Sequence, residues 1–517
     1  MRTNFAMTQA IFQSQGKVTL SKVELTIIKG LYHFEISGLT KQASLDCYNR
    51  LLAALRNNAL AMPKGRIIAS IEPCTENKKS TAFDLALAIL LLHANQQLAI
   101  NPTKLAETVL CGELSLVGEI KPCPGIYAGL CEAKRQGIKS AIIPLANLAE
   151  ARNITGISIF PVKNLMQAIA VLQENLPLVT DLPSDYFRSP SKGLANKAVV
   201  IGQEMAQLAL QIALLGKHPL LLLGAPGCGK TCLSRLLPWL LPPLEEFERQ
   251  ELAELYSSFG IWDDAVSQHQ RPIIAPHHSI TASGLIGGGA SCKLGACSMS
   301  HHGVLFLDEL SEYSSRVLAL LREPIESKKI LLKRAQYERK LPTDFLLIAA
   351  SNPCPCGQIL EHKCRCSKAD VKRYLQRLSG PIWDRFQLTV VLKSLPSEQL
   401  LEAVGLETNN TSSSAQLSPE QIATIWQKQR ERNQKLTGET VLNGDLSSQC
   451  LAEVCQLHKH TDFLRQLVDT RQISARKFAS LLKVARTIAD WQAKPEVEQS
   501  HIQQALFWQV ELATLLQ

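Results

Sequence analysis

The feature that most constrains this chain is a phosphate-binding loop between a buried strand and a helix. An apolar run at residues 220–223 leads into GAPGCGKT, which matches the pattern G-x-x-x-x-G-K-[ST]. In this pattern the glycines let backbone N–H groups turn toward phosphates, the lysine reaches the β and γ oxygens, and the hydroxyl holds Mg²⁺. The expected ATP contacts are Gly224, Ala225, Pro226, Gly227, Cys228, Gly229, Lys230 and Thr231.

A second motif predicts hydrolysis of the bound nucleotide. The apolar run at residues 304–307 ends in Asp308 and Glu309. Alone, such a pair is better explained as a solvated strand end, but a phosphate-binding loop in the same chain favours a catalytic role. Asp308 would hold Mg²⁺ together with Thr231, and Glu309 would polarise the attacking water. ATP and Mg²⁺ are therefore the expected cofactors.

Length and composition indicate a multidomain globular protein. A chain of 517 residues is expected to form about two to four domains, and 46% hydrophobic with 20% charged residues is ordinary for such a chain. Its apolar runs are shorter than the roughly 20 residues that span a bilayer, and no cleavable signal pattern opens it, so we expect a cytoplasmic protein without a membrane partner. The net charge of +9 permits an anionic partner without requiring one.

The order of segments predicts an α/β protein in three parts. Residues 1–180 alternate strand-like and helix-like segments, including the strand RIIASIEP, the helix DLALAILLLHANQQL and the hairpin TVLCGELSLVGEI. Residues 181–197 and 397–416 are rich in turn-forming or polar residues and read as linkers. Between them, residues 198–396 hold the phosphate-binding loop and a predicted helix SSRVLALLREPIES. Residues 417–517 are helical, beginning with a cap and a proline at SPEQ, and a second predicted cap, Ser474, begins the helix ARKFASLLKVARTIADW.

Several segments resemble the ComM/YifB family of magnesium-chelatase-like AAA+ ATPases. They are GELSLVGEIKPCPG, GIKSAIIP, PHHS, a triple glycine at residues 287–289 and GVLFLDEL, and the resemblance extends over nearly the whole chain. It implies a Lon-protease-like (S5-like) N-terminal domain, an AAA+ P-loop core and a C-terminal helical lid. It also implies a hexameric ring that acts on branched or single-stranded DNA as a branch-migration helicase in homologous recombination during natural transformation, with recombination proteins as further partners.

Two other functions fit the same phosphate chemistry. A chelatase motor would insert Mg²⁺ into a porphyrin with separate partner subunits, and an ATP-dependent protease would need a serine–lysine dyad in the N-terminal domain. The nucleophile position of Lon-like proteases corresponds here to Ala82. The segment expected to carry their catalytic lysine corresponds to residues 125–132, which contain no lysine. Ser80 and Lys121 as a displaced dyad are a weaker hypothesis than ordinary surface residues. We therefore expect a domain without peptidase activity.

The resemblance also assigns residues around the γ-phosphate. Asn352, at the end of FLLIAASN, matches the first sensor position, and Arg476 in SAR matches the second sensor, on the lid. Arg385 in the D-R-F triplet matches the arginine finger that acts on the ATP of the next subunit, with Arg373 and Arg377 as alternatives. For the adenine base, the matching stretch comprises Val200, Ile201 and Gly202, although core packing explains these residues equally well.

A predicted hairpin, KKILLKRAQYERKLP, supplies the expected contacts with DNA. In the helicase-containing group of AAA+ proteins the corresponding hairpin projects into the central pore, where basic residues would contact phosphates without reading sequence. The triple glycine nearby predicts a mobile loop, and the flanking histidine pairs His277–His278 and His301–His302 are better explained as polar loop residues than as zinc ligands. The expected DNA contacts are Lys328, Lys329, Lys333, Arg334, Arg339 and Lys340.

A cysteine cluster follows the first sensor. Cys354, Cys356, Cys364 and Cys366 form C-x-C-x7-C-x-C, which collects four of the fifteen cysteines of the chain. Four thiolates at this spacing can surround one tetrahedral Zn²⁺, although the usual knuckle spacing is C-x2-C. We expect structural zinc here that ATP chemistry does not require, since some members of the family lack these cysteines.

Overall fold

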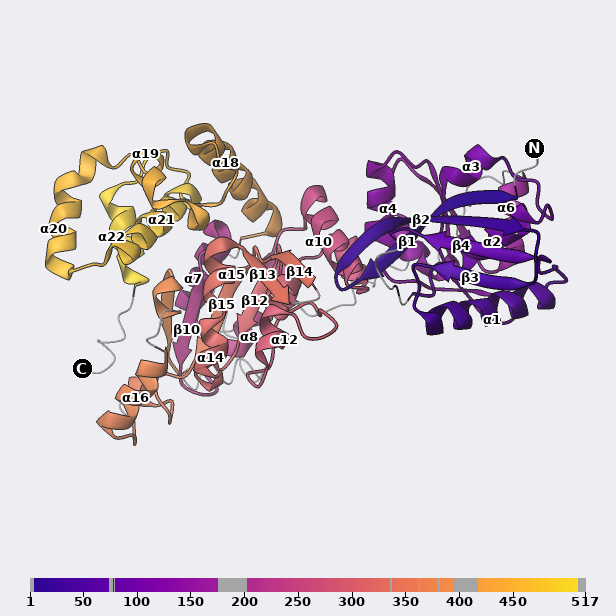
Figure 1. Cartoon of the computed structure of the whole chain (residues 1–517). Coiled ribbons are helices and arrows are strands. Elements are labelled where there is room, and N and C mark those ends of the chain that lie inside the picture. Colours follow the sequence, from indigo (N-terminus) through magenta and orange to yellow (C-terminus); the bar gives the residue numbers. More distant parts are fainter. Residues whose placement is uncertain are drawn as a thin grey trace, which may run out of the picture. The chain divides into compact units, whose positions relative to one another are not determined.

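The computed structural model describes residues 4–73, 78, 80–174, 202–334, 337–361, 363–378, 382–394 and 417–509 (Figure 1). Both predicted linkers, and Val200 and Ile201, lie outside these residues. The chain divides into two compact units, which are described separately. Unit 1 comprises residues 1–191 and 245–269, and unit 2 comprises residues 192–244 and 270–517.

Unit 1 is built on a mixed sheet that, among the described residues, has seven strands in the order β3-β4-β2-β1-β5-β8-β9. The strands β1, β2 and β4 pair antiparallel, whereas β5, β8 and β9 continue in parallel from β1. A separate small hairpin is formed by β6 and β7. The strand bounds are β1 (Phe5–Ser14), β2 (Lys17–Ile28), β3 (His33–Ser37), β4 (Arg66–Ile71), β5 (Thr108–Leu110), β6 (Glu113–Leu114), β7 (Ile120–Lys121), β8 (Ser140–Pro144) and β9 (Ser158–Val162).

The helices of unit 1 cover this sheet. The most apolar of them, α2 (Asp84–Ala94), is buried at every residue except His93, as expected for a helix inside a core. Its single acidic residue, Asp84, is paired with Arg50 at 2.6 Å, which offsets the cost of burying a carboxylate. The other helices are α1 (Lys41–Asn57), α3 (Pro102–Ala106), α4 (Ile126–Arg135), α5 (Leu148–Ala151) and α6 (Leu165–Glu174).

One helix joins unit 1 from far along the chain. Helix α10 (Glu246–Ser258) and the short α11 (Asp264–Ser267) lie between the phosphate-binding loop and the acidic strand end in sequence. In space α10 packs on α4, where the Ser257 hydroxyl donates to Glu150 at 2.6 Å and Arg135 forms two bonds to Glu254. Residues 245–269, which the sequence placed in the ATPase core, therefore fold with the N-terminal unit.

Unit 2 contains a parallel sheet that, within the described part of the chain, has five strands in the order β11-β12-β15-β10-β16. Nearly continuous apolar runs form its central strands because both faces of the sheet are covered. The strand bounds are β10 (Leu220–Gly224), β11 (Ile273–Ile274), β12 (Val304–Leu307), β15 (Leu346–Ser351) and β16 (Leu388–Leu392), and β13 (Lys329–Arg334) pairs with β14 (Tyr337–Pro342) as a separate hairpin.

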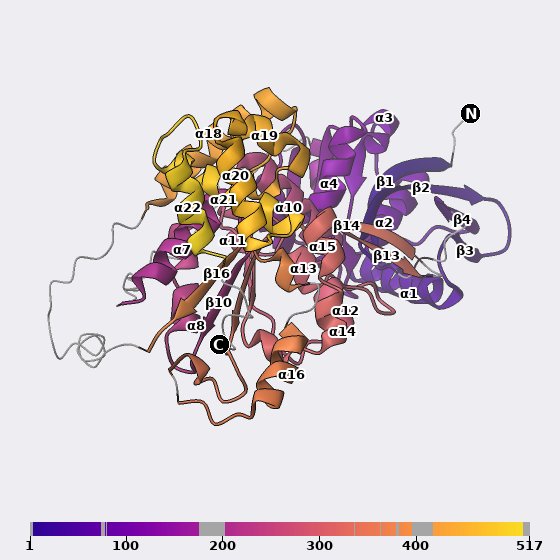
Figure 2. The same ribbon diagram turned by 90° about the vertical axis from the view of Figure 1, so that its left-hand side faces the viewer.

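The helices of unit 2 fall into a core set and a lid set. The core set is α7 (Glu204–Gly216), α8 (Lys230–Ser234), α9 (Leu237–Leu240), α12 (Ala282–Ile286), α13 (Ala296–Met299), α14 (Ser315–Ala319), α15 (Arg322–Ser327) and α16 (Lys368–Leu378). The lid set is α18 (Pro419–Thr437), α19 (Leu451–Val454), α20 (Thr461–Arg471), α21 (Ala475–Trp491) and α22 (Gln499–Phe507). Both sets share one buried core, and Figure 2 shows the lid helices gathered beside α7.

Most predicted elements are confirmed, and two need correction. The caps at Ser418 and Ser474 begin α18 and α21, and the basic hairpin forms β13 and β14. The predicted hairpin TVLCGELSLVGEI instead contributes β5 to the main sheet, and only its second half forms the β6–β7 hairpin. The predicted single helix SSRVLALLREPIES is two helices, α14 and α15, which separate at residues 320–321.

Candidate functional site

The phosphate motif and the acidic motif meet at the carboxyl edge of the unit 2 sheet. Strands β10, β12 and β15 are parallel neighbours, so the residues that follow each of them emerge at the same edge. The structure brings four predicted residues into direct contact there: Lys230, Thr231, Asp308 and Asn352. This cluster is the phosphate site.

Lys230 begins helix α8 and points back over the loop. Its Nζ donates to the carbonyl oxygens of Gly224 at 2.7 Å and Ala225 at 2.8 Å, and to Oδ1 of Asn352 at 3.1 Å. Burial lowers the pKa of Lys230, and Cys228 and Asp308 oppose that shift. The loop around it turns through left-handed backbone at Gly227 (φ 81°) and Gly229 (φ 95°), which glycine adopts without strain.

The residues predicted to hold Mg²⁺ lie side by side. The Thr231 hydroxyl donates to Oδ2 of Asp308 at 2.8 Å, and Oδ1 of Asp308 accepts from the backbone N–H of Glu309 at 2.9 Å. A hydroxyl and a carboxylate at the start of a helix are the oxygen ligands that Mg²⁺ prefers beside phosphates. The donor set therefore fits this ion.

The predicted catalytic glutamate is held by a histidine. Glu309 has a left-handed backbone (φ 50°), and its Oε2 lies 3.0 Å from Nδ1 of His278. His278 follows β11, the strand that pairs with β12, which is why the two residues meet at one edge. His278 was considered from the sequence only as a metal ligand or a polar loop residue. In the structure it is positioned to orient Glu309.

The two predicted arginines lie together at the opposite edge of the sheet. Arg385 precedes β16 and Arg476 is in the second position of α21, and both bond to Oε1 of Glu326, at 2.7 Å and 2.9 Å. They line a cavity of ≈ 530 Å³ whose walls include the amino ends of β10, β15 and β16. Glu326 has no sequence signal that would have identified it, since a single acid on a helix is ordinarily solvated.

This arrangement separates Arg476 from the phosphate loop of its own chain. At about 3.3 Å per residue, the five residues of β10 separate the two edges by roughly 15 Å. Arg476 is therefore placed with the finger position Arg385 and away from the phosphate loop of the same chain. Of the alternative fingers, Arg373 lies on α16 and is paired with Asp370, and the side chain of Arg377 is outside the described residues.

The basic hairpin exposes most of its predicted DNA contacts, whereas Lys328 is half-buried and ion-paired. Lys329, Lys333 and Lys340 are exposed, with Lys333 paired to Glu338 at 3.6 Å, while Arg334 is exposed near the tip and Arg339 is half-buried. Lys328 is different, because its Nζ lies 2.5 Å from Asp445 and 3.0 Å from Asp344. Burial would lower the pKa of Lys328, but the two carboxylates raise it. The prediction of a DNA contact at Lys328 is wrong, because this lysine ties α15 to the lid.

The triple glycine forms a turn against the hairpin. Gly288 and Lys293 exchange two backbone hydrogen bonds of 2.8 Å, and the Tyr337 hydroxyl donates to the carbonyl of Gly289 at 2.7 Å. Added Cβ atoms at Gly287 would lie 2.9 Å from the carbonyl oxygen of Lys293, so the tight turn depends on glycine there. This loop and the hairpin are thus neighbours.

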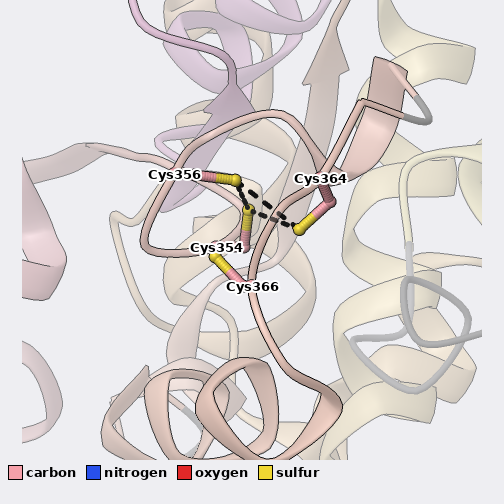
Figure 3. A group of neighbouring side chains, drawn as sticks. All are labelled: Cys354, Cys356, Cys364 and Cys366. Atoms are coloured by element: carbon pink, nitrogen blue, oxygen red, sulfur yellow. Dashed lines mark hydrogen bonds between the residues drawn. The ribbon is translucent and has the colours of Figure 1, made fainter.

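The four cysteines of the predicted zinc site converge (Figure 3). The Sγ atoms of Cys354, Cys356 and Cys364 lie 3.5–3.7 Å apart, and all four, including that of Cys366, lie within 4.8 Å of one another. Four sulfurs at about 2.3 Å from a tetrahedral Zn²⁺ would be about 3.8 Å apart, so the donor set fits that ion.

The cysteine loop also touches the phosphate-binding loop. A Cβ added to Gly357 would lie 2.3 Å from Cδ of Pro226, so the two backbones are packed directly against each other. On the adenine side, the Gln203 amide donates to the carbonyl of Cys228 at 3.0 Å, which places the neighbouring Gly202 beside the phosphate loop. Both contacts brace the loop from outside.

Unit 1 shows no serine–lysine pairing at the positions considered from the sequence. Ala82 is buried in the core, Lys121 is bonded to Glu119 at 2.8 Å, and the Ser80 hydroxyl accepts from the backbone N–H of Ala82.

In the described part of the chain, no helix combines the length and apolar character needed to cross a membrane.

Comparisons with known proteins agree with this architecture. Residues 197–400 match the family model "Magnesium chelatase, subunit ChlI", residues 23–147 match "Subunit ChlI of Mg-chelatase", and residues 411–509 match "Magnesium chelatase, subunit ChlI C-terminal". Competence protein ComM of Haemophilus influenzae is 34% identical over 97% of both chains. The uncharacterized protein YifB of Salmonella typhimurium is 36% identical over 94% of this chain and 93% of its own.

A third relative is matched over a part only. Lon protease 2 of Bacillus subtilis is 28% identical over 30% of this chain and 32% of its own length. The family models and the two full-length relatives carry the assignment, and the parallel sheet with its phosphate loop agrees with the expected α/β class. The chain therefore belongs to the ComM/YifB family of magnesium-chelatase-like AAA+ ATPases, whose common feature is an ATP-driven motor core.

Proposed function

We propose that this protein is an Mg²⁺-dependent ring motor, most simply a hexamer, that hydrolyses ATP to drive branch migration of DNA during recombination in natural transformation. The observation that carries the proposal is the division of the phosphate chemistry between two edges of one sheet, combined with an exposed basic hairpin on the same unit. Competence protein ComM, a relative that is similar along 97% of this chain, supports the cellular setting.

The carboxyl edge supplies the binding and hydrolysis groups. The Lys230 ammonium is already directed at the loop carbonyls and would move onto the β and γ oxygens, while Thr231 and Asp308 would hold Mg²⁺. When bound, that ion would offset negative charge on the phosphates. Glu309, oriented by His278, would polarise the attacking water, and Asn352 lies where it can position that water beside the γ-phosphate.

The amino edge supplies the groups that complete a neighbouring site. Arg385 and Arg476 lie away from their own phosphate loop, and a guanidinium stabilises phosphoryl charge only by contact. Both arginines therefore act on the ATP of the next copy, and Glu326 holds them until that phosphate competes for them. A chain with complementary half-sites on opposite edges assembles head to tail, and we infer that the rotation between successive copies closes this assembly as a ring.

The hairpin and the glycine turn supply the contact with DNA. Lys329, Lys333 and Lys340 are exposed along β13 and β14, and the turn at Gly288–Gly289 lies against the same hairpin. Lysines on a projecting hairpin contact phosphates and read no sequence, which suits a motor that moves along any strand. The cysteine cluster would hold structural Zn²⁺ and keep Gly357 pressed against the phosphate loop.

Two rival functions share the ATP chemistry. A chelatase motor would use the same phosphate site but has no need of an exposed basic hairpin. An ATP-dependent protease would need the dyad that Ala82, Ser80 and Lys121 do not form. ATP-dependent hydrolysis of casein would restore the protease hypothesis.

The decisive experiment measures remodelling of a labelled three- or four-stranded DNA junction with ATP, over a series of salt concentrations. Lys230→Ala serves as the inactive control. Remodelling that disappears in this variant and weakens with salt supports a motor that grips phosphates. ATP turnover without movement of the junction, and without any effect of DNA on the rate, contradicts the helicase and turns the search to chelatase partners. Full turnover by Lys230→Ala would contradict the phosphate assignment itself.

A further inference from the structure

Unit 1 carries an exposed apolar and aromatic face that its own fold does not require. Between β2 and β3 the chain exposes Ile28 (44%), Leu31 (93%) and Tyr32 (49%), and Leu45 on α1 is 54% exposed. Large side chains this exposed and this close together commonly mark an interaction surface. The face is referred to below as the aromatic face.

The aromatic rings of this face form a continuous set. Tyr48 on α1 lies 6.4 Å from Tyr32 and 5.2 Å from Phe34, measured between ring centroids. The Tyr32 and Tyr48 hydroxyls are hydrogen-bonded at 3.1 Å, which fixes both rings. Helix α1 returns along β3 after a short turn (Figure 1). On this helix, Leu45, Tyr48 and Arg56 fall on one stripe at helical spacing.

Basic residues surround the aromatic face. The exposed basic residues around it are Lys29, Arg56, Lys64 and Arg66. Strand β2 ends where β3 and β4 begin, since both Ile28 and His33 are register partners of Arg66. Two acidic groups are near. Glu35 is ion-paired with Arg66 at 3.4 Å, and Asp46 accepts a hydrogen bond from Gln42. The balance of these charges is positive, so the face complements an anion.

We propose that the aromatic face binds single-stranded nucleic acid, with Leu31 and Tyr32 in contact with unstacked bases and the surrounding lysines and arginines in contact with phosphates. Fixed aromatic rings offer stacking surfaces to any base, and cations beside them follow the backbone. The inference rests on the proposed function for the identity of the substrate. The site belongs to unit 1, whereas the hairpin β13–β14 belongs to unit 2, and the site requires no ATP.

Photo-crosslinking of the full chain tests the face directly. The probe is an oligo-deoxythymidine that contains 5-iodo-deoxyuridine, without nucleotide, and the crosslinked peptides are identified by mass spectrometry. We expect a crosslink at Tyr32 or Tyr48 that weakens with salt. The double variant Leu31→Ser with Tyr32→Ala should weaken binding of the oligonucleotide about tenfold, in the range that stacking contributes. The matched control is Leu116→Ser, which removes a leucine that is 57% exposed elsewhere on unit 1.

The outcomes separate this inference from the motor. Unchanged ATP turnover without DNA shows that unit 2 of the double variant is folded, and an unchanged circular-dichroism spectrum shows that unit 1 is folded too. A crosslink on unit 1 without junction movement would support the face and contradict the motor. Crosslinks confined to the hairpin, with unchanged affinity in the double variant, would overturn the face and leave the motor standing. Self-association that the double variant abolishes, or binding to anionic phosphatidylglycerol vesicles in place of DNA, would also overturn it.

Discussion

The two edges of the unit 2 sheet carry different halves of one chemistry. At the carboxyl edge, Lys230, Thr231, Asp308 and Asn352 are joined by hydrogen bonds of 2.8–3.1 Å. At the amino edge, Arg385 and Arg476 are joined through Glu326. The first cluster can bind a nucleotide but has no arginine, and the second has arginines but no phosphate loop. Under the proposed function, this difference means that a single chain holds an incomplete site and that assembly is part of catalysis.

The largest expected effect tests whether the two edges meet between chains. Lys230→Ala and Arg385→Ala should each lower turnover of ATP by about 10³, the range known for arginine fingers and phosphate-loop groups. Mixed and allowed to exchange subunits, the two inactive variants should regain activity, because roughly a quarter of the interfaces would unite an intact Lys230 with an intact Arg385. The measurement is steady-state phosphate release. A mixture as inactive as its components would show that each site is completed within one chain.

The next effect concerns how the amino edge is attached to the lid. His218 precedes β10 and bonds to Gln387 at 2.6 Å and to Thr487 on α21 at 2.7 Å. Burial lowers the pKa of His218 to about 4 from an ordinary value of 6.5. The unfolded chain therefore binds a proton at a higher pH than the folded one, and stability is lost as the pH falls from about 6.5 to about 4. At about 1.4 kcal/mol per unit, the expected loss is about 3 kcal/mol.

Urea unfolding at several pH values measures that loss. Because other groups also titrate below pH 5, the comparison is the difference between the native chain and His218→Gln. The variant should be less stable at neutral pH and should show a smaller loss between pH 6.5 and 4. Parallel pH dependences in the two proteins would mean that His218 is protonated in the folded state.

A smaller effect is expected at the carboxyl edge, where His278 orients Glu309. Removal of this contact leaves the carboxylate in place but free to rotate, so His278→Ala should lower kcat about tenfold with little change in KM. The neighbouring His277→Ala is the matched control, because the His277 ring bonds to Ser279 and not to Glu309. Equal effects of the two substitutions would indicate a general disturbance of the loop.

The smallest expected effect tests whether the cysteine cluster supports the phosphate loop or takes part in ATP hydrolysis. Cys364→Ser should release Zn²⁺, measured by a colorimetric chelator, and should raise KM for ATP about threefold to tenfold while kcat stays within about twofold. The reason is the contact of Gly357 with Pro226, through which the cysteine loop braces the phosphate loop. A large fall in kcat would place the cluster in the chemistry, and purified native protein without zinc would contradict the metal.

Much of the site was predictable because its residues follow local rules. The phosphate loop requires its glycines, lysine and threonine in consecutive positions, and Asp308 and Glu309 directly follow an apolar strand. Both arginines were identified only by resemblance to a family. His278 and Glu326 were missed, because each acts through a partner that is distant in the sequence, and no spacing rule links a residue to such a partner.

The hairpin shows the same limit of sequence-based prediction, here for a residue that was assigned a role and not for one that was missed. Lys328 and Lys329 are adjacent and chemically identical, and both were predicted from the sequence to contact DNA. The fold pairs Lys328 with Asp344 and Asp445 and leaves Lys329 exposed, because Lys328 ends α15 with a left-handed backbone (φ 54°) while Lys329 begins β13. Asp344 follows the second hairpin strand by two residues, but Asp445 lies on the lid, more than 100 residues along the chain.

By itself, the sequence of this protein determined the α/β class, the phosphate loop, the acidic strand end, the caps of α18 and α21 and the family. These depend on short-range spacing and periodicity, which are properties of consecutive residues. Only the tertiary structure decided that α10 packs with unit 1, that the arginines lie at the edge opposite the phosphate loop, and that Glu326 and His278 hold the groups predicted to react. The physical reason is that parallel strands bring together the residues that precede or follow them, whatever the length of chain between them.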